Sequence, residues 1–338
     1  MTGMIRARKM LWLSIVGFIG LVSWRPLAVA FSACTQPGFS QSAPEFHRTI
    51  PVTASDPVTL DVQLSAGELQ IAYGRDGQVS ITAFIQVPVG AKPDKESLAT
   101  ELTVEQQRNH LRIRDLSSTR TAEEKVRIVC RIDVPYWTEV NSVVDHGKQT
   151  IIGIMGPVKA RTRKGDIKVS YISKGVLAEA YSGNLDLQVI GEHVQARTGN
   201  GNISCVRSVQ GASAETENGD IVLMVVGPSM AEIKNGTGRI DLGGATGSFA
   251  GSTAGGDLNV KGMPHGDWRL NSASGNIRIE LPPAAKFELD ATTNFGQVVN
   301  DRDDITSTNG EVRHLHRKVN GGGKLIEIHT DGGRIVIR

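Results

Sequence analysis

Hydrophobic and polar residues alternate along the chain, and between residues 147 and 298 the alternation is divided into repeats of about 18 residues. A glycine marks each repeat, and the steps between successive glycines are 18, 18, 18, 18, 19, 18 and 19 residues. The glycines that set this spacing are Gly147, Gly165, Gly183, Gly201, Gly219, Gly238, Gly256 and Gly275. Gly296 follows after 21 residues. A fixed period of this length is typical of a solenoid, in which similar units stack on one another.

The residues that follow each glycine predict a short strand with one buried face. Positions two and four after the glycine lie on the same side of a strand, and both are apolar in nearly every repeat. The first of these positions holds Ile167, Leu185, Ile203, Ile221, Ile240, Leu258, Ile277 and Val298. Gln149 departs from this pattern in the first repeat. Cys205 occupies the second position, so we interpret it as a small apolar core residue.

A second strand precedes each glycine. Positions seven, five and three before the glycine alternate with residues that are mostly polar. The first of these positions holds Val158, Val176, Val194, Ala212, Ala231, Phe249, Trp268 and Leu289. The other two are mostly Ala and Thr, so one inner face is bulky and the facing one is small. Large residues opposite small ones suit a thin, tightly packed core.

We therefore predict an all-β protein, a β-solenoid of stacked two-strand turns of about 18 residues with an irregular β N-terminal cap. Equivalent residues of parallel stacked turns would lie about 4.8 Å apart. An array of antiparallel β-hairpins is the competing geometry. Parallel stacking is favoured because every column of residues keeps its chemistry from one repeat to the next.

Together with the repeats, the flanking sequences divide the chain into five predicted segments. They are a signal peptide (1–30), a flexible leader (31–45), an irregular β region that forms the N-terminal cap (46–140), the solenoid repeats (141–300) and C-terminal closing strands (301–338). Within the cap, residues 67–71 and 77–81 resemble degenerate early rungs. At the other end, Arg334 and Arg338 are expected to protect the last strand edge, because charged residues discourage edge-to-edge association.

The first 34 residues indicate export. Basic residues precede an apolar run at 11–24, and the Ala-Val-Ala sequence at 28–30 predicts cleavage after Ala30. The run is shorter than the roughly 20 residues that cross a bilayer, and an uncleaved membrane anchor is the alternative. A third interpretation is acylation of Cys34, because Phe31–Cys34 resembles a bacterial lipobox. The expected location is the periplasm, the cell envelope or the exterior, with membrane attachment only through an uncleaved signal or a lipid.

Charge and cysteine content narrow the classes of partner. Residues 1–30 carry four basic residues and no acidic ones, so their removal changes the formal net charge from +2 to −2. The mature chain then lacks a basic footprint for nucleic acid and a polybasic segment for an anionic membrane surface. The spacing of Cys34, Cys130 and Cys205 matches no zinc pattern. We expect no nucleic-acid partner and no cofactor.

The order of these features resembles a known family. A secretion signal and an irregular β region are followed by Ile132-Asp133-Val134-Pro135 and then by units such as Asn218-Gly219-Asp220-Ile221-Val222-Leu223. Over residues 46–338 the chain is similar to the bacterial "putative adhesin" β-strand-repeat family of unknown function. The resemblance implies an exported or envelope-associated solenoid without established catalytic residues. It transfers a fold better than a function.

The position directly after each glycine is the most prominent polar column. It forms a candidate surface ladder of Asp166, Asn184, Asn202, Asp220, Asp257 and Asn276, with Arg239 interrupting it. Stacked oxygen ligands could bind calcium, but the repeat lacks the Gly-Gly-x-Gly-x-Asp unit of calcium-binding rolls. Asp and Asn also suit turns for local reasons. The structural interpretation is favoured over a metal site.

Two further groups bear on catalysis. His314 and His316 share a face of a predicted strand, with His329 and Asp331 nearby, and imidazoles at this spacing can share a metal. The surrounding cations oppose metal binding, and a solvated basic face is the ordinary interpretation. An enzyme that acts on polysaccharides would need clustered acids and bases, and no such cluster is apparent in the sequence.

The leading functional hypothesis is a non-enzymatic solenoid of the cell envelope that presents a repetitive surface for adhesion, for binding or for a structural role. Its partner would be an envelope or extracellular molecule that the sequence does not identify. A polysaccharide-active β-helix enzyme and a regulatory component of the envelope-stress response are the alternatives.

Overall fold

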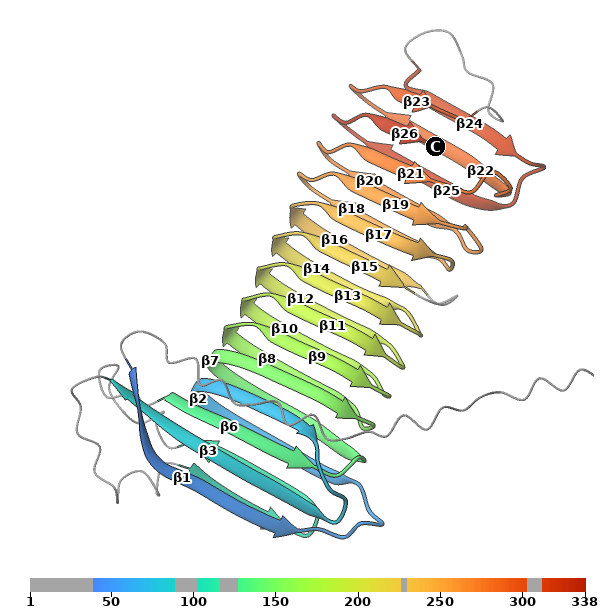
Figure 1. Ribbon diagram of the computed structural model, residues 1–338. Helices are drawn as coiled ribbons and strands as arrows, with labels where there is room; N and C mark the ends of the chain where they lie inside the picture. Colours follow the sequence, from blue (N-terminus) through green and yellow to red (C-terminus); the bar gives the residue numbers. More distant parts are fainter. Residues whose placement is uncertain (1–38, 89–101, 116–126, 226–229, 303–311) are drawn as a thin grey trace, which may run out of the picture. The chain divides into compact units, whose positions relative to one another are not determined.

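Strands of successive repeats pair in parallel and form two stacks, as the computed structural model shows (Figure 1). The structure describes residues 39–88, 102–115, 127–225, 230–302 and 312–338, and every element in these ranges is a β-strand. The pre-glycine stack contains β8 (Val158–Lys164), β10 (Val176–Ser182), β12 (Val194–Asn200), β14 (Ala212–Asn218), β16 (Ala231–Thr237), β18 (Phe249–Thr253) and β20 (Trp268–Ser272). The post-glycine stack contains β9 (Ile167–Ile172), β11 (Leu185–Ile190), β13 (Ile203–Ser208), β15 (Ile221–Val225), β17 (Ile240–Ala245), β19 (Leu258–Gly262) and β21 (Ile277–Glu280).

The register of the pairs follows the columns of the sequence. Val176 pairs with both Val158 and Val194, and Leu185 pairs with both Ile167 and Ile203. A rung is therefore one strand of each stack with the turns that join them. This confirms the predicted β-solenoid and excludes the hairpin array, which would pair neighbouring strands antiparallel.

Each repeat glycine is required by the close approach of neighbouring rungs. Gly165, Gly183 and Gly201 have φ angles of +147°, +153° and +155°, a region that side chains rarely adopt. A Cβ atom built on any of them would overlap the carbonyl oxygen of the glycine one rung earlier. Only glycine lets the backbone turn and stack at this corner.

The inward side chains form one continuous core. Ile167, Leu187 and Ile203 are fully buried, and Trp268 occupies its predicted inward column with 1% exposure. Cys205 also faces the core, and burial, with a smaller effect from Asp186, raises the pKa of its thiol to about 12. It is a core residue, as the sequence predicts, and its burial keeps the thiol protonated.

The inward threonines of the pre-glycine stack have a specific hydrogen-bonding role. The hydroxyl of Thr198 donates to the carbonyl oxygen of Gly183 at 2.9 Å, and the hydroxyl of Thr216 donates to that of Gly201 at 3.0 Å. These carbonyls belong to the corner glycines of the preceding rung. The Thr column therefore satisfies backbone acceptors that the tight corner leaves inside the core.

The N-terminal region joins the stack out of sequence order. β2 (Val58–Tyr73) and β7 (Thr138–Ile154) are long strands that contribute to both stacks, and they pair in parallel with Gly67 opposite Gly147. On the far side of β2 lie β5 (His110–Asp115) and β6 (Arg127–Val134), also parallel to it. The segment at 67–71 is thus a true rung, as predicted.

Antiparallel strands flank the parallel rungs at the N-terminal end. β4 (Leu102–Gln107) pairs with β5, β3 (Gln78–Pro88) pairs with β6, and β1 (Phe39–Pro51) pairs with β3. The interpretation of residues 77–81 as a rung is therefore wrong, because they lie in antiparallel β3. Reversing the strand direction ends the parallel repeat, as expected of a cap.

The C-terminal strands are also inserted out of order. The strands here are β22 (Phe287–Thr293), β23 (Val298–Asn300), β24 (His314–Val319), β25 (Lys324–Thr330) and β26 (Ile335–Ile337). β25 pairs with β20 and β22, and β26 pairs with β21 and β23, so the end of the chain fills a rung between two earlier ones. The expectation that Arg334 and Arg338 protect the last edge is wrong, because β26 is paired on both sides. Antiparallel β24 lies beside β22 instead.

Candidate functional site

The six residues of the candidate surface ladder bind the backbone of the next rung. The Oδ1 atom of Asp166 accepts the backbone N–H of Asn184 at 2.9 Å, and that of Asn202 accepts the N–H of Asp220 at 2.8 Å. The same bond is made by Asn184, Asp220, Asp257 and Asn276, at 2.8–3.0 Å. In the part of the chain that the structure describes, no group of His, Cys, Asp or Glu is arranged to hold a metal ion. These oxygens have a structural partner in each rung.

The other residues singled out from the sequence lie apart from one another. Ala30 and Cys34 fall outside the described residues. His314 and His316 point outward from β24 toward the carboxylates of β22, and the Nε2 of His316 lies 3.2 Å from Glu288. His329 lies 3.3 Å from Asp331. These imidazoles meet carboxylates on an exposed face, so the surface beside His314 and His316 has mixed charge and is not simply basic.

Outward charges of the pre-glycine stack alternate from rung to rung. Arg161 pairs with Glu179 at 2.6 Å, and Arg197 pairs with Glu215 at 3.3 Å. Lys234 continues the column, and its pKa is raised by a hydrogen bond and by the charge of the neighbouring Glu232. Such exposed pairs stabilise little individually, but opposite charges opposed across strands favour the correct register. The partners of each pair are 18 residues apart, one repeat, so this pattern is visible in the sequence, although the sequence analysis above does not include it.

A cluster of exposed aromatic rings lies where β6 passes into β7. Tyr73 ends β2, and Tyr136 and Trp137 form the turn between β6 and β7. The ring centroids of Tyr73 and Tyr136 are 5.3 Å apart and those of Tyr136 and Trp137 are 6.4 Å apart, both edge-on. Their exposed fractions are 45%, 42% and 53%. We call these three residues the aromatic corner.

The backbone fixes the aromatic corner in place. The backbone N–H of Met155 donates to the carbonyl of Tyr136 at 2.9 Å, and that of Val58 donates to the carbonyl of Trp137 at 3.0 Å. The N–H of Tyr136 donates to the carboxylate of Asp76 at 3.1 Å. These bonds tie the turn to two neighbouring rungs, so the rings are presented in a defined arrangement.

Apolar surface continues from the aromatic corner onto β7 and β9. Ile152 pairs with Ser170, which places Gly153 beside Tyr171. A Cβ atom on Gly153 would lie only 3.6 Å from the Cβ of Tyr73, so Tyr73 and Tyr171 lie on either side of a position without a side chain. Ile152 and Tyr171 are 37% and 57% exposed. The result is a row of exposed apolar groups across three rungs.

Polar groups border the aromatic corner. Asp133 lies opposite Ala72 in the pairing of β6 with β2, directly before Tyr73, and it forms an ion pair with Arg131 at 3.1 Å. Asp76 lies on the other side, through its bond to the turn. Aromatic faces flanked by carboxylates and a guanidinium can contact both apolar and hydrogen-bonding groups of a ligand.

Residues 60–338 match the family described as Toastrack DUF4097. The chain belongs to the Toastrack DUF4097 family. The match begins within β2, which contributes to both stacks. It extends to the end of the chain and so includes the inserted C-terminal rung. The protein is thus a Toastrack β-solenoid, and the family carries no assigned function.

Solved structures with low sequence identity are similar to the Toastrack solenoid. A "putative cell adhesion protein" from Clostridium sporogenes is 13% identical with a TM-score of 0.23, over 87% of this chain and 99% of that chain. A "putative adhesin" from Bacteroides fragilis is 10% identical with a TM-score of 0.33, over 88% of this chain and 98% of that chain. A "putative lipid binding protein" from Parabacteroides distasonis is 13% identical with a TM-score of 0.43, over 88% and 98%. No curated protein matches the sequence significantly. In its described residues the Toastrack chain has no helix that is long and apolar enough to cross a membrane.

Proposed function

We propose that this Toastrack protein is an exported, non-catalytic binding protein of the cell envelope, and that its aromatic corner binds a glycan. The observation that carries the proposal is the exposure of Tyr73, Tyr136 and Trp137 on a turn fixed by backbone hydrogen bonds. Keeping large aromatic rings exposed to water has a free-energy cost, which a partner that covers the rings would remove. The signal peptide predicted at residues 1–30 supports an envelope location.

The mixture of groups at the corner favours a sugar as the partner. The apolar part consists mainly of flat aromatic rings, which match the C–H face of a pyranose. The border consists of the charged groups of Asp76, Asp133 and Arg131, which suit hydroxyl groups. A protein partner would also meet the aromatic rings, so the assay must distinguish the two.

The proposal assigns binding without turnover. A general acid needs a carboxyl group with a raised pKa. Asp61 lies outside the aromatic corner, hydrogen-bonded to His110 and Asn141. Burial alone would raise its pKa, but hydrogen bonds from His110 and Asn141 and the charges of His110 and Arg112 lower it. Asp133 at the corner is held in an ion pair.

The test is co-sedimentation of the full-length protein with insoluble glycans, namely peptidoglycan sacculi, chitin and cellulose. Replacing Trp137 by Ala should weaken binding to the preferred glycan by at least about tenfold, which corresponds to about 1.4 kcal/mol. Tyr181→Ala is the matched control, because Tyr181 is 72% exposed but lies on β10 outside the corner. Its binding should equal that of the wild type.

Two outcomes would overturn the proposal. The aromatic corner is not a glycan site if the wild-type protein co-sediments with none of the glycans. The same conclusion follows if the Trp137→Ala and Tyr181→Ala variants bind the glycan equally well. Soluble reducing sugar released during the incubation would overturn the non-catalytic assignment and favour the polysaccharide-active alternative.

A further inference from the structure

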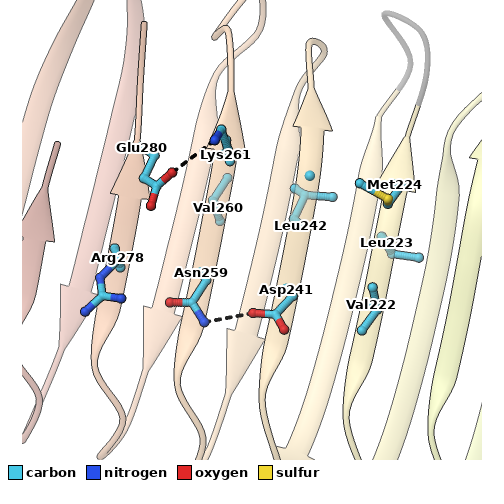
Figure 2. Close-up of a pocket in the computed structure, with 11 residues that line it drawn as sticks. Val222, Leu223, Met224, Asp241, Leu242, Asn259, Val260, Lys261, Arg278 and Glu280 are labelled. Atoms are coloured by element: carbon cyan, nitrogen blue, oxygen red, sulfur yellow. Dashed lines mark hydrogen bonds and ion pairs between the residues drawn. The ribbon is translucent and has the colours of Figure 1, made fainter.

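A shallow depression lies on the outward face of the post-glycine stack, away from the aromatic corner (Figure 2). It spans β15, β17, β19 and β21 and has a volume of about 320 Å³. Gly243 is one of the lining residues, and its outward position between Met224 and Lys261 in the strand pairing carries no side chain. The methyl group of Met224 borders this gap, since a Cβ atom on Gly243 would lie 3.1 Å from it. A break in the column of outward side chains therefore creates the depression.

One side of the depression is apolar. Val222 and Met224 both point outward from β15 and are 36% and 50% exposed. Val206 lies next to Met224 on the neighbouring strand and extends this surface. Methionine is flexible and polarizable, so it adapts to ligands of irregular shape. This side suits an aliphatic chain.

The opposite side carries Arg278, a cation with no ion-pair partner among the described residues. Asp241 accepts a hydrogen bond from Asn259 at 2.8 Å and pairs with Arg239 at 2.9 Å. Glu280 pairs with Lys261 at 3.4 Å. Arg278 stands between Asn259 and Val336 in the strand pairing, and no described residue offers it an ion pair. Figure 2 shows its guanidinium at the border of the depression without a marked contact.

We propose that this depression binds a small organic anion with an aliphatic tail, and that Arg278 holds the anionic group. A guanidinium binds a carboxylate or a phosphate in a two-pronged arrangement. The tail lies over Gly243 against Met224 and Val222. A volume of about 320 Å³ is at the lower end of ligand sites and corresponds to about ten water-sized groups at roughly 30 Å³ each. A chain of about eight carbons fills it.

The test uses the full-length protein with its methionine methyl groups labelled with ¹³C, because the Met224 methyl lies in the site. The resonance is assigned with Met224→Leu. Octanoate should shift this resonance in a saturable titration. Octyl phosphate should do the same, because it also combines an anionic group with an aliphatic tail. Acetate, which lacks the tail, and 1-octanol, which lacks the charge, should leave the resonance unchanged at equal concentration.

Two variants test the assigned roles. Arg278→Gln should weaken octanoate binding at least about tenfold, and Gly243→Val should abolish it by filling the depression. Gly243 has no positive φ angle and meets only the end of the Met224 side chain, so this variant should fold. Lys168→Gln is the control, because Lys168 occupies the same outward column but is paired with Asp186.

Either of two results would overturn the inference. One is octanoate binding that is unchanged in Arg278→Gln. The other is a Met224 shift that acetate or 1-octanol reproduces. The site is separate from the aromatic corner, so its failure would leave the glycan proposal intact.

Discussion

The hydrogen bonds from the inward threonines to the corner glycines predict a measurable difference between two chemically identical substitutions. Thr216 is 2% exposed, and its hydroxyl donates to the carbonyl of Gly201 at 3.0 Å. Thr162 occupies the same column at 6% exposure, but its buried hydroxyl has no hydrogen-bond partner. Valine keeps the branched shape of threonine and removes the hydroxyl. The substitution therefore isolates the hydrogen bond.

Thr216→Val should destabilise the protein by about 1–3 kcal/mol, because it leaves the carbonyl of Gly201 buried without its side-chain donor. Thr162→Val should be neutral or slightly stabilising, since it removes a buried polar group that has no partner. Thr198→Val should behave like Thr216→Val, because Thr198 donates to Gly183 at 2.9 Å.

The assay is equilibrium unfolding in guanidinium chloride, followed by circular dichroism. With a slope of about 2–6 kcal/mol per molar, the midpoint for Thr216→Val should fall by about 0.2–1.5 M. Solenoids can unfold in more than one step, so amide hydrogen exchange at the neighbouring rung serves as a second measurement. Equal midpoints for the Thr216 and Thr162 variants would refute the reasoning, because burial and shape alone would then explain both.

Two further predictions follow from the rungs. Gly201→Ala should cost about 2–3 kcal/mol, because backbone strain and overlap with the preceding rung act together. Gly321→Ala is its control, since Gly321 also has a positive φ angle but has no atom within 4 Å of the built Cβ; equal losses would mean that the overlap is unimportant. The lowered pKa of Asp61 means that its contribution to stability is present above the ordinary value of 3.8 and is lost as the pH falls through the folded-state pKa. Wild type should therefore lose more stability than Asp61→Asn between about pH 6 and about pH 3, as measured by denaturant midpoints, and parallel curves would contradict this.

The stacked rungs could be predicted from sequence because their determinants are local. A corner glycine, an apolar pair after it and a Thr before it recur within one repeat, and each has a physical role within one or two rungs. Thr330, Gly333 and Ile335 repeat this pattern, and in the structure Gly333 stacks on Gly275, so the predicted closing strands form a further rung. What local patterns cannot encode is the order of rungs. Gly296 and Gly333 fit the same column equally well, and the choice depends on how the chain end packs.

The aromatic corner could not be found by spacing for a related reason. Tyr73 and Tyr136 are far apart in the sequence and come together only because β2 is inserted between β6 and β7. The depression at Gly243 gives a weak sequence signal, a missing side chain in an outward column. That column varies freely from repeat to repeat, so a single glycine in it has no evident meaning until the neighbouring strands are placed.

Both proposed sites lie where an outward column is interrupted, and the physics of the solenoid gives a reason. Inward positions are constrained by the core, and the corner positions by the glycine stacking and by the Asp and Asn ladder. The outward columns are mostly occupied by paired charges such as Arg161 and Glu179. A partner must displace those pairs to bind, which weakens any contact with a continuous ladder. A position without a side chain, at Gly153 or Gly243, exposes neighbouring apolar groups that a partner can contact without first displacing a charge pair at that position. Binding on this fold should therefore be found at breaks in the outward columns, and not along the uninterrupted repeats.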